Sequence, residues 1–168
     1  MKTHFRRLRE DEFDAAYSIV CERTRWLLDR GLRQWPRPPA ESVYYREFSA
    51  GQIYALAVDD RPAVVLSLMR YSTRRWHQQV GTEPLWWLCT LASALDFRGQ
   101  GLGARAVEEA ATYLAGLGAE DLYLDCIVHS GDFLPRYYAT MGFDELARRT
   151  VSRPDGTEVE MALLRRRL

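Results

Sequence analysis

The sequence lacks the features that would assign it to an exported, membrane or metal-binding class. Its histidines show no metal-ligand spacing with one another or with carboxylates. No apolar run forms the core of a signal peptide or approaches the length of a membrane span. The cysteines are scattered and odd in number, which argues against a disulfide framework and a zinc site; they are Cys21, Cys89 and Cys126. We therefore expect a cytoplasmic protein with no bound metal and no membrane contact.

The sequence also lacks an excess of charge of either sign. Its 168 residues include 23 Lys and Arg against 23 Asp and Glu. No summed field would draw the molecule onto nucleic acid, so any anion site must be local. Because 168 residues suit one substantial core and no low-complexity linker is present, we expect a single domain over residues 1–168, as a monomer or homodimer.

Hydrophobic periodicity and turn residues predict helices and strands in the order βααβββαβαββ. The predicted strands are 5–8, 53–58, 63–70, 85–95, 122–128, 146–151 and 159–164. The predicted helices are 13–28 with a C-cap near Gly31, 41–50, 102–117 and 133–141. Hairpins and one strand–helix–strand crossover imply a mixed central sheet flanked by helices. The fold class is α+β, or α/β by a looser definition.

A glycine-rich turn separates the apolar run 85–95 from the helix that follows. Glycines let successive backbone N–H groups point into one concavity, and the helix start adds unpaired amides with partial positive charge. Arg98 and Arg105 can add charge-assisted hydrogen bonds to phosphate oxygens. Three glycines in five residues exceed the need of a simple turn, which is the alternative interpretation. The turn residues are Arg98, Gly99, Gln100, Gly101, Leu102 and Gly103.

The same turn also fits the relaxed dinucleotide fingerprint, as Gly99-x-Gly101-x-x-Ala104 with Asp125 about 20 residues on. A dinucleotide fold needs several further strand–helix units after that point, whereas this chain ends in a predicted hairpin. The order of elements therefore argues against NAD. No Gly-Lys-Ser or Gly-Lys-Thr pair is present, which excludes a nucleoside-triphosphate loop.

Two motifs make the chain resemble the GNAT superfamily of N-acetyltransferases. Arg98-x-x-Gly101-x-Gly103 fits that family's Arg/Gln-x-x-Gly-x-Gly/Ala signature. The family's Tyr-x-x-x-Gly-Phe segment is similar to the run Tyr137-Tyr138-Ala139-Thr140-Met141-Gly142-Phe143. The predicted element order is also the family's order, so the resemblance covers nearly the whole chain.

The resemblance implies an acyl-CoA-dependent N-acyltransferase that moves an acetyl or other short acyl group from acyl-CoA to a primary amine. It implies a sheet that splits between the fourth and fifth sequential long strands to admit the pantetheine arm. The implied coenzyme-binding residues are Leu91, Ala92 and Ser93 on the strand, and Arg98, Gly99, Gln100, Gly101, Leu102, Gly103 and Ala104 on the turn. Acetyl-CoA or another acyl-CoA would be the co-substrate, without a metal.

The chemistry needs a neutral amine, a polarised carbonyl and a proton for the departing thiolate. Tyr138 matches the family's general acid, while the alternative is that Tyr137 and Tyr138 only pack the short helix. A backbone amide in 91–93 is the natural oxyanion donor. The base stays open among Glu83, Asp125, Cys89 and an ordered water, and a covalent acyl-Cys89 is disfavoured because no histidine is close in sequence.

One position departs from the family pattern, because Gly131 stands where many members carry Asn, and Ser130 or Asp132 is a candidate substitute. Aromatic residues suggest a partly apolar wall for a small amine, with core or subunit-interface packing as the alternative; they are Trp26, Trp35, Tyr44, Tyr45, Trp76, Trp86 and Trp87. A protein or peptide amine acceptor and a non-catalytic acyl-CoA-binding module are the other functions that the sequence leaves open.

Overall fold

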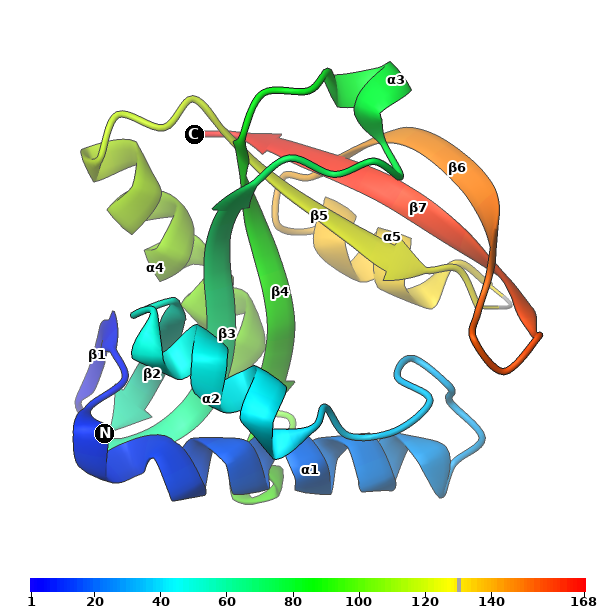
Figure 1. Cartoon of the computed structure of the whole chain (residues 1–168). Coiled ribbons are helices and arrows are strands. Elements are labelled where there is room, and N and C mark those ends of the chain that lie inside the picture. The colour runs from blue at the N-terminus through cyan, green and yellow to red at the C-terminus, as the bar shows by residue number, and fades with distance from the viewer. Residues whose placement is uncertain (130) are drawn as a thin grey trace. The chain divides into compact units, whose positions relative to one another are not determined.

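The computed structural model describes residues 1–129 and 131–168 (Figure 1). The chain divides into two compact units. Unit 1 consists of Met1–Met69 and Leu88–Ala110, and unit 2 of Arg70–Trp87 and Ala111–Leu168. Neither unit is one continuous segment of the chain. The single domain over residues 1–168 therefore stays a prediction, and each unit is described by itself.

Unit 1 contains two whole α-helices and the first part of a third, together with a group of strands that includes two antiparallel pairs. β1 pairs with β2, and β2 pairs with β3 through a register shift between Leu56 and Ala57. β4 is hydrogen-bonded next to β3 in the strand order. The elements that lie wholly in unit 1 are β1 (Thr3–Arg7), η1 (Glu10–Glu12), α1 (Phe13–Leu28), α2 (Glu41–Ser49), β2 (Ile53–Val58) and η2 (Leu95–Phe97). Three further elements lie partly in unit 1: β3 (Arg61–Tyr71) as far as Met69, β4 (Leu85–Ser93) from Leu88 onward, and α4 (Leu102–Gly116) as far as Ala110.

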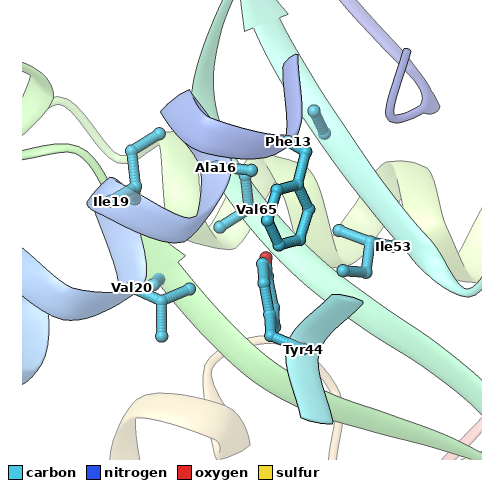
Figure 2. Close-up of a cluster of buried hydrophobic side chains, with 9 residues drawn as sticks. Phe13, Ala16, Ile19, Val20, Tyr44, Ile53 and Val65 are labelled. Carbon is cyan, nitrogen blue, oxygen red and sulfur yellow. The ribbon is translucent and has the colours of Figure 1, made fainter. Parts of the chain in front are cut away.

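The core of unit 1 joins α1 and α2 to the strands. Figure 2 shows Phe13 of α1 and Tyr44 of α2 pointing toward one another, with ring centroids 6.0 Å apart. Burying each large apolar side chain of this kind contributes about 1.5–3 kcal/mol. α1 ends as predicted, because Gly31 has φ of 71° and the Leu32 N–H donates to the Leu27 carbonyl. The cluster consists of Phe13, Ala16, Ile19, Val20, Tyr44, Ile53, Ala55, Val65 and Ala92.

Unit 2 is built on strands in the order β4, β5, β7, β6. Antiparallel pairs join β5 to β7 and β7 to β6, and β4 runs parallel to β5 with Trp87 opposite Tyr123. Within unit 2 this parallel register consists of the pair Trp87 and Tyr123. The remaining elements are α3 (His77–Val80), β5 (Asp121–Ile127), α5 (Phe133–Ala139), β6 (Asp144–Ser152) and β7 (Glu158–Arg167).

Aromatic rings organise the interior of unit 2. Trp87 lies between Tyr71 and Tyr123, with centroid distances of 5.5 Å and 5.6 Å, and its indole N–H donates to the Tyr71 carbonyl. Trp76 is fully buried, and its indole N–H donates to Asp125. These contacts anchor the segment before β4 to β5.

The structure confirms the predicted α+β class and mixed sheet, and it adds elements that periodicity did not predict. α3 and the two 3-10 turns η1 and η2 are too short to show a helical repeat. The fourth predicted strand ends at Ser93 rather than residue 95, because Ala94 begins the turn into η2.

Three findings bear on the absences that the sequence predicted. Among the described residues, no helix has both the length and the apolar character needed to cross a membrane. Within residues 1–129 and 131–168, no three or more His, Cys, Asp or Glu side chains gather as a metal site would require. The three cysteines are free thiols.

Candidate functional site

The glycine-rich turn of unit 1 has the backbone conformation that its glycines permit. Gly99 has φ of 78° and Gly101 has φ of 70°, values that a residue with a side chain rarely adopts. A Cβ atom at either glycine would meet no atom within 4 Å. Backbone conformation rather than crowding therefore requires glycine here, and the space beside both positions is open. Residues 98–101 are exposed.

The turn leads directly into α4, whose first amides complete the concavity. Arg105 is the first residue of this helix whose amide donates to a backbone carbonyl, that of Gly101, at 3.2 Å. The preceding N–H groups at a helix start lack intrahelical acceptors and carry partial positive charge. Leu102 is buried and anchors the turn, while Gly103 and Ala104 are half-buried. The predicted turn residues therefore form one open site that suits a phosphate group.

The last residues of β4 alternate between the core and the partly exposed face of unit 1. Ala92 is 1% exposed and belongs to the core cluster, whereas Leu91 and Ser93 are half-buried. The Ala94 N–H donates to the Ala63 carbonyl of β3 at 2.8 Å. The predicted strand residues therefore sit on a segment held firmly to its neighbour.

Thr90 interrupts β4 immediately before this segment. Its φ is 50°, a left-handed value that is an outlier for a β-branched residue. Strained backbone of this kind costs about 1–3 kcal/mol and often marks a functional site. Sequence reasoning missed Thr90, because a threonine inside an apolar run indicates only a strand.

Three arginines surround the indole of Trp26 in unit 1. The guanidinium carbons of Arg30, Arg23 and Arg98 lie 3.9 Å, 5.1 Å and 5.6 Å from the ring centroid. Arg23 also donates from Nε and Nη2 to the Ser93 carbonyl, at 3.0 Å and 2.7 Å. Burial, and secondarily the neighbouring Arg98 charge, lower the pKa of Arg23. We call this set the Trp26 cluster.

The Trp26 cluster was not predicted, although a signal for part of it was present. Arg23 and Trp26 are spaced i and i+3 on α1, which places them on one helical face, and Arg30 follows two residues after the end of this helix. The contribution of Arg98, 68 positions beyond Arg30, could not be read from local spacing.

Tyr138, the predicted acid, belongs to unit 2 and packs inside it. Its side chain is 6% exposed, and its ring makes edge contacts with Tyr137 and Phe143 at 5.4 Å and 5.7 Å. Tyr137 is half-buried, and desolvation raises the pKa of its phenol. The ring of Tyr138 is therefore packed inside unit 2, and the acid role of its hydroxyl stays a proposal.

The structure bears on one of the two substitutes for the missing Asn. Ser130 lies outside the described residues. Asp132 occupies the N-cap position of α5 with φ of 54°, but its side chain makes no capping hydrogen bond. Its Oδ2 instead accepts from Nη2 of Arg148 at 3.0 Å, and these hydrogen bonds lower the pKa of Asp132. Asp132 is thus engaged within unit 2.

The candidate bases differ in their surroundings. In unit 2, Oδ2 of Asp125 accepts from Nη1 of Arg75 and the indole of Trp76, both at 2.9 Å, which is an anchoring role. Glu83 of unit 2 is exposed, and Cys89 of unit 1 is half-buried.

Glu47 on α2 is a further titratable group, which the sequence did not single out. Burial raises the pKa of its carboxyl, against the opposing hydrogen bond that Ser67 Oγ donates at 2.8 Å. A carboxyl with a raised pKa is a candidate base in general terms. Its position three residues after the core residue Tyr44 was the available signal, because that spacing keeps a side chain on the same helical face.

Most of the predicted aromatic wall proves to be core. Tyr44, Trp76 and Trp87 are buried, and Trp35 packs against the core cluster of unit 1. Tyr45 is 54% exposed. It borders a hollow of about 690 Å³ in unit 1 that contains none of the predicted coenzyme residues and is lined by Leu8, Glu10, Asp11, Phe13, Asp14, Tyr45, Phe48 and Ser49.

Comparison with known proteins gives a family match over most of the chain. Residues 13–143 match the Acetyltransferase (GNAT) family. YesJ of Bacillus subtilis (strain 168), an uncharacterized N-acetyltransferase, is 26% identical over 141 residues, which are 80% of this chain and 77% of YesJ.

Two solved structures illustrate the shared fold. The ribosomal-protein-S18-alanine N-acetyltransferase of Escherichia coli is similar with a TM-score of 0.70 and 18% identity, over 99% of this chain and 94% of that chain. The yncA protein of Salmonella typhimurium, solved with its cofactor acetyl-CoA, is similar with a TM-score of 0.73 and 11% identity, over 100% and 95% of the two chains. At these identities the likeness shows the fold alone.

Proposed function

The chain belongs to the acetyltransferase (GNAT) family, and on that premise we propose that it transfers an acetyl or other short acyl group from acyl-coenzyme A to the primary amine of a small molecule. The observation that carries the proposal is the open turn at Gly99 and Gly101, followed by the unpaired amides at the start of α4. This arrangement suits the pyrophosphate of the coenzyme, which concentrates negative charge on two adjacent phosphoryl groups.

The proposed coenzyme site lies on unit 1. The amides of Gly99 and of residues 101–104 would hold the pyrophosphate, and Arg98 would add a charged hydrogen bond. The backbone of residues 91–93 would pair with the pantetheine arm. The strained Thr90 supports this assignment, because it redirects the strand backbone immediately before the amide proposed to polarise the thioester carbonyl.

The proposed reaction is a direct attack through a tetrahedral intermediate. The amine nitrogen forms a bond to the thioester carbonyl carbon, and the carbon–sulfur bond then breaks. The amine loses one proton to a base or to water, and the departing thiolate gains one from the phenol of Tyr138. A cytoplasmic location is part of the proposal, because proteins of reducing compartments carry free cysteines, as this chain does at three positions.

The decisive experiment measures coenzyme A release from acetyl-CoA with a panel of amines, for the parent and for Tyr138→Phe. Phenylalanine keeps the volume of the ring, so the fold and coenzyme affinity should survive. Loss of the proton donor should lower turnover about 10²-fold or more, as for an interaction made mainly in the transition state. Tyr137→Phe is the matched control and should lose far less.

The other outcomes separate the remaining functions. Equal turnover of the parent and Tyr138→Phe would leave that residue as packing only. Coenzyme A binding without transfer to any amine or peptide would favour a binding module. Acetylation of peptides but not of small amines would favour a protein acceptor, which is what the Escherichia coli protein acts on according to its name.

A further inference from the structure

We propose that the Trp26 cluster binds an acidic group of the acceptor, so that the substrate is an amine that also carries a carboxylate or phosphonate. This inference rests on the proposed acetyl transfer and names the substrate class of that reaction. The cluster consists of Arg23, Arg30 and Arg98 around Trp26, all in unit 1.

The cluster gathers positive charge without a carboxylate partner. Across residues 1–129 and 131–168, the ion pairs engage Arg6, Arg9, Arg75, Arg148 and Arg165, and none of them involves the three arginines of the cluster. Stacking on Trp26 offsets part of the mutual repulsion, because each cation over an indole gains a modest attraction. The rest of the repulsion remains, and Arg98 is one cause of the lowered pKa of Arg23. A bound anion would remove that repulsion.

The donors of the cluster are only partly used. A guanidinium carries five N–H donors. Arg23 uses Nε and Nη2 on the Ser93 carbonyl, and Arg30 uses Nη1 on the Trp26 carbonyl. Contact with the indole holds these side chains in place, so that the donors that remain are pre-organised for a planar or tetrahedral oxyanion.

The position of Arg23 connects the cluster to the reacting end of the substrate. In a trans peptide the C=O of one residue and the N–H of the next point in opposite directions. The Ala94 N–H faces Ala63 of β3, so the Ser93 carbonyl and the guanidinium of Arg23 lie at the opposite edge of β4. Two residues along a strand span about 7 Å. An amine attacking beside Leu91 therefore needs only a short link to place an acid at Arg23.

A phosphate of the coenzyme has the same chemistry and is the competing source of an anion, since Arg98 also begins the turn. The acceptor is favoured because Arg23 and Arg30 come from α1 and the residues just after it, where they contact Trp26 of the predicted acceptor wall, and only Arg98 belongs to the turn.

The test compares matched amines with and without an acid on parent and variants. The pairs are L-phenylalanine with 2-phenylethylamine, and 2-aminoethylphosphonate with ethylamine. Arg23→Gln and Arg30→Gln remove one charge each, and Arg25→Gln on the exposed face of α1 is the control. At saturating acetyl-CoA, we expect kcat/KM for the acidic amine to fall about 10-fold in each cluster variant, relative to its partner without the acid. Arg25→Gln should leave that ratio unchanged.

Three results would overturn the inference. Equal losses for both members of each pair would make the arginines structural. If the ratio of kcat/KM between the acidic amine and its partner is unchanged in all variants, the cluster does not bind the acid of the acceptor. The third result is that the cluster variants bind coenzyme A more weakly by calorimetry and lose the preference that the parent shows for coenzyme A over 3′-dephospho-coenzyme A. That result would assign the anion to the coenzyme.

Failure of the proposed reaction is distinguishable from failure of the site. If the parent acetylates no amine of the panel, calorimetric titration of L-phenylalanine and 2-aminoethylphosphonate into the coenzyme-bound parent and into Arg30→Gln still decides the matter. Binding that weakens about 10-fold in the variant supports the anion site, and equal or absent binding overturns it.

Discussion

Two groups of arginine, one in each unit, contrast in how their charge is balanced. In unit 2, Arg148 meets the carboxylates of Asp132, Glu145 and Glu160 at 3.0 Å, 2.5 Å and 3.2 Å. Hydrogen bonds to Glu145 and then Asp132 raise the pKa of Arg148. In unit 1, the Trp26 cluster stacks on an aromatic ring instead. An arginine with its carboxylates in place has completed its interactions, whereas one held by stacking keeps donors for a ligand.

A third arginine group shows how burial changes the value of a paired charge. The carboxylate of Glu12 in unit 1 accepts hydrogen bonds from both Nη atoms of Arg6, at 2.6 Å and 2.7 Å. It also accepts hydrogen bonds from the backbone N–H and from Nη2 of Arg9. The side chain of Glu12 is 7% exposed. Ion pairs of this kind matter for folding because either partner alone would be a buried charge.

The largest effect, on coenzyme A affinity, is expected from placing a carboxylate in the open glycine-rich turn of unit 1. In Gly101→Asp, the new charge lies in the open turn and repels the pyrophosphate, and φ of 70° strains the new residue. We expect coenzyme A affinity to fall at least about 10²-fold by calorimetry. Gly156→Asp in the β6–β7 hairpin is the control, because Gly156 also has positive φ, 80°, with nothing within 4 Å of a Cβ. Parent-like binding by both variants would contradict the phosphate site.

The next effect is expected from removing the charge of a buried pair. Glu12→Gln keeps an acceptor for Arg6 but leaves that guanidinium without its counter-ion. We expect the free energy of unfolding to fall by about 2 kcal/mol in urea denaturation, less than for a fully buried pair whose partner is deleted. Asp11→Asn, at a side chain that is 81% exposed, is the control and should change little. Equal effects of the two variants would refute the distinction between buried and exposed pairs.

The same pair predicts a pH dependence. Burial alone would raise the pKa of Glu12, but the hydrogen bonds from Arg6 and Arg9 prevail and hold it below 4.5. Between the pKa of Glu12 in the folded chain and its pKa in the unfolded chain, the unfolded chain binds more protons. The stability that Glu12 contributes is therefore complete above about pH 4.5 and is lost as the pH falls through the folded pKa. Unfolding curves of the parent and Glu12→Gln should therefore converge as pH falls from 7 to about 3. A constant difference would show that the charge of Glu12 is irrelevant.

A smaller effect is expected at the exposed network of unit 2. Arg148→Gln breaks three ion pairs that water already screens, so Tm should fall by no more than about 3 °C. Coenzyme A affinity should not change in Arg148→Gln, because Arg98 and not Arg148 is the arginine proposed to bind the coenzyme. A marked loss of coenzyme affinity in Arg148→Gln would erase the contrast between the two arginine groups.

The smallest effect is expected where a polar group is buried without a partner. The hydroxyl of Tyr44 has no hydrogen-bond partner within the described part of the chain, and burial raises its pKa. Tyr44→Phe removes that group and keeps the ring, so the free energy of unfolding should stay equal or rise by up to about 1 kcal/mol. Destabilisation by more than this would reveal a polar role for the hydroxyl.

Local chemistry explains which parts of the fold the sequence predicted. Gly31 and Gly118 end helices with positive φ, as their positions after apolar periodic runs indicate. Gly99 and Gly101 take left-handed conformations in the predicted phosphate turn for the same reason. These features depend on a few neighbouring residues, so one sequence suffices to find them.

The parts that the sequence did not predict depend on contacts between distant segments. α3 has four residues, and the segment around it is held by Trp76 and Asp125, which are 49 positions apart. The left-handed Thr90 and the stacking of Arg98 on Trp26 likewise need the folded chain. The role of Tyr138 rests on the family motif, and packing alone does not test it.

The position of β7 in the strand order has a consequence for synthesis. β7 pairs with β5 on one side and β6 on the other, although it follows both along the chain. Until β7 leaves the ribosome, the edges of β5 and β6 that it will cover have unpaired backbone groups, which invite pairing with other chains. The pairing of β5 and β6 is therefore incomplete until β7 has been synthesised, and we expect a chain truncated before β7 to aggregate or be degraded.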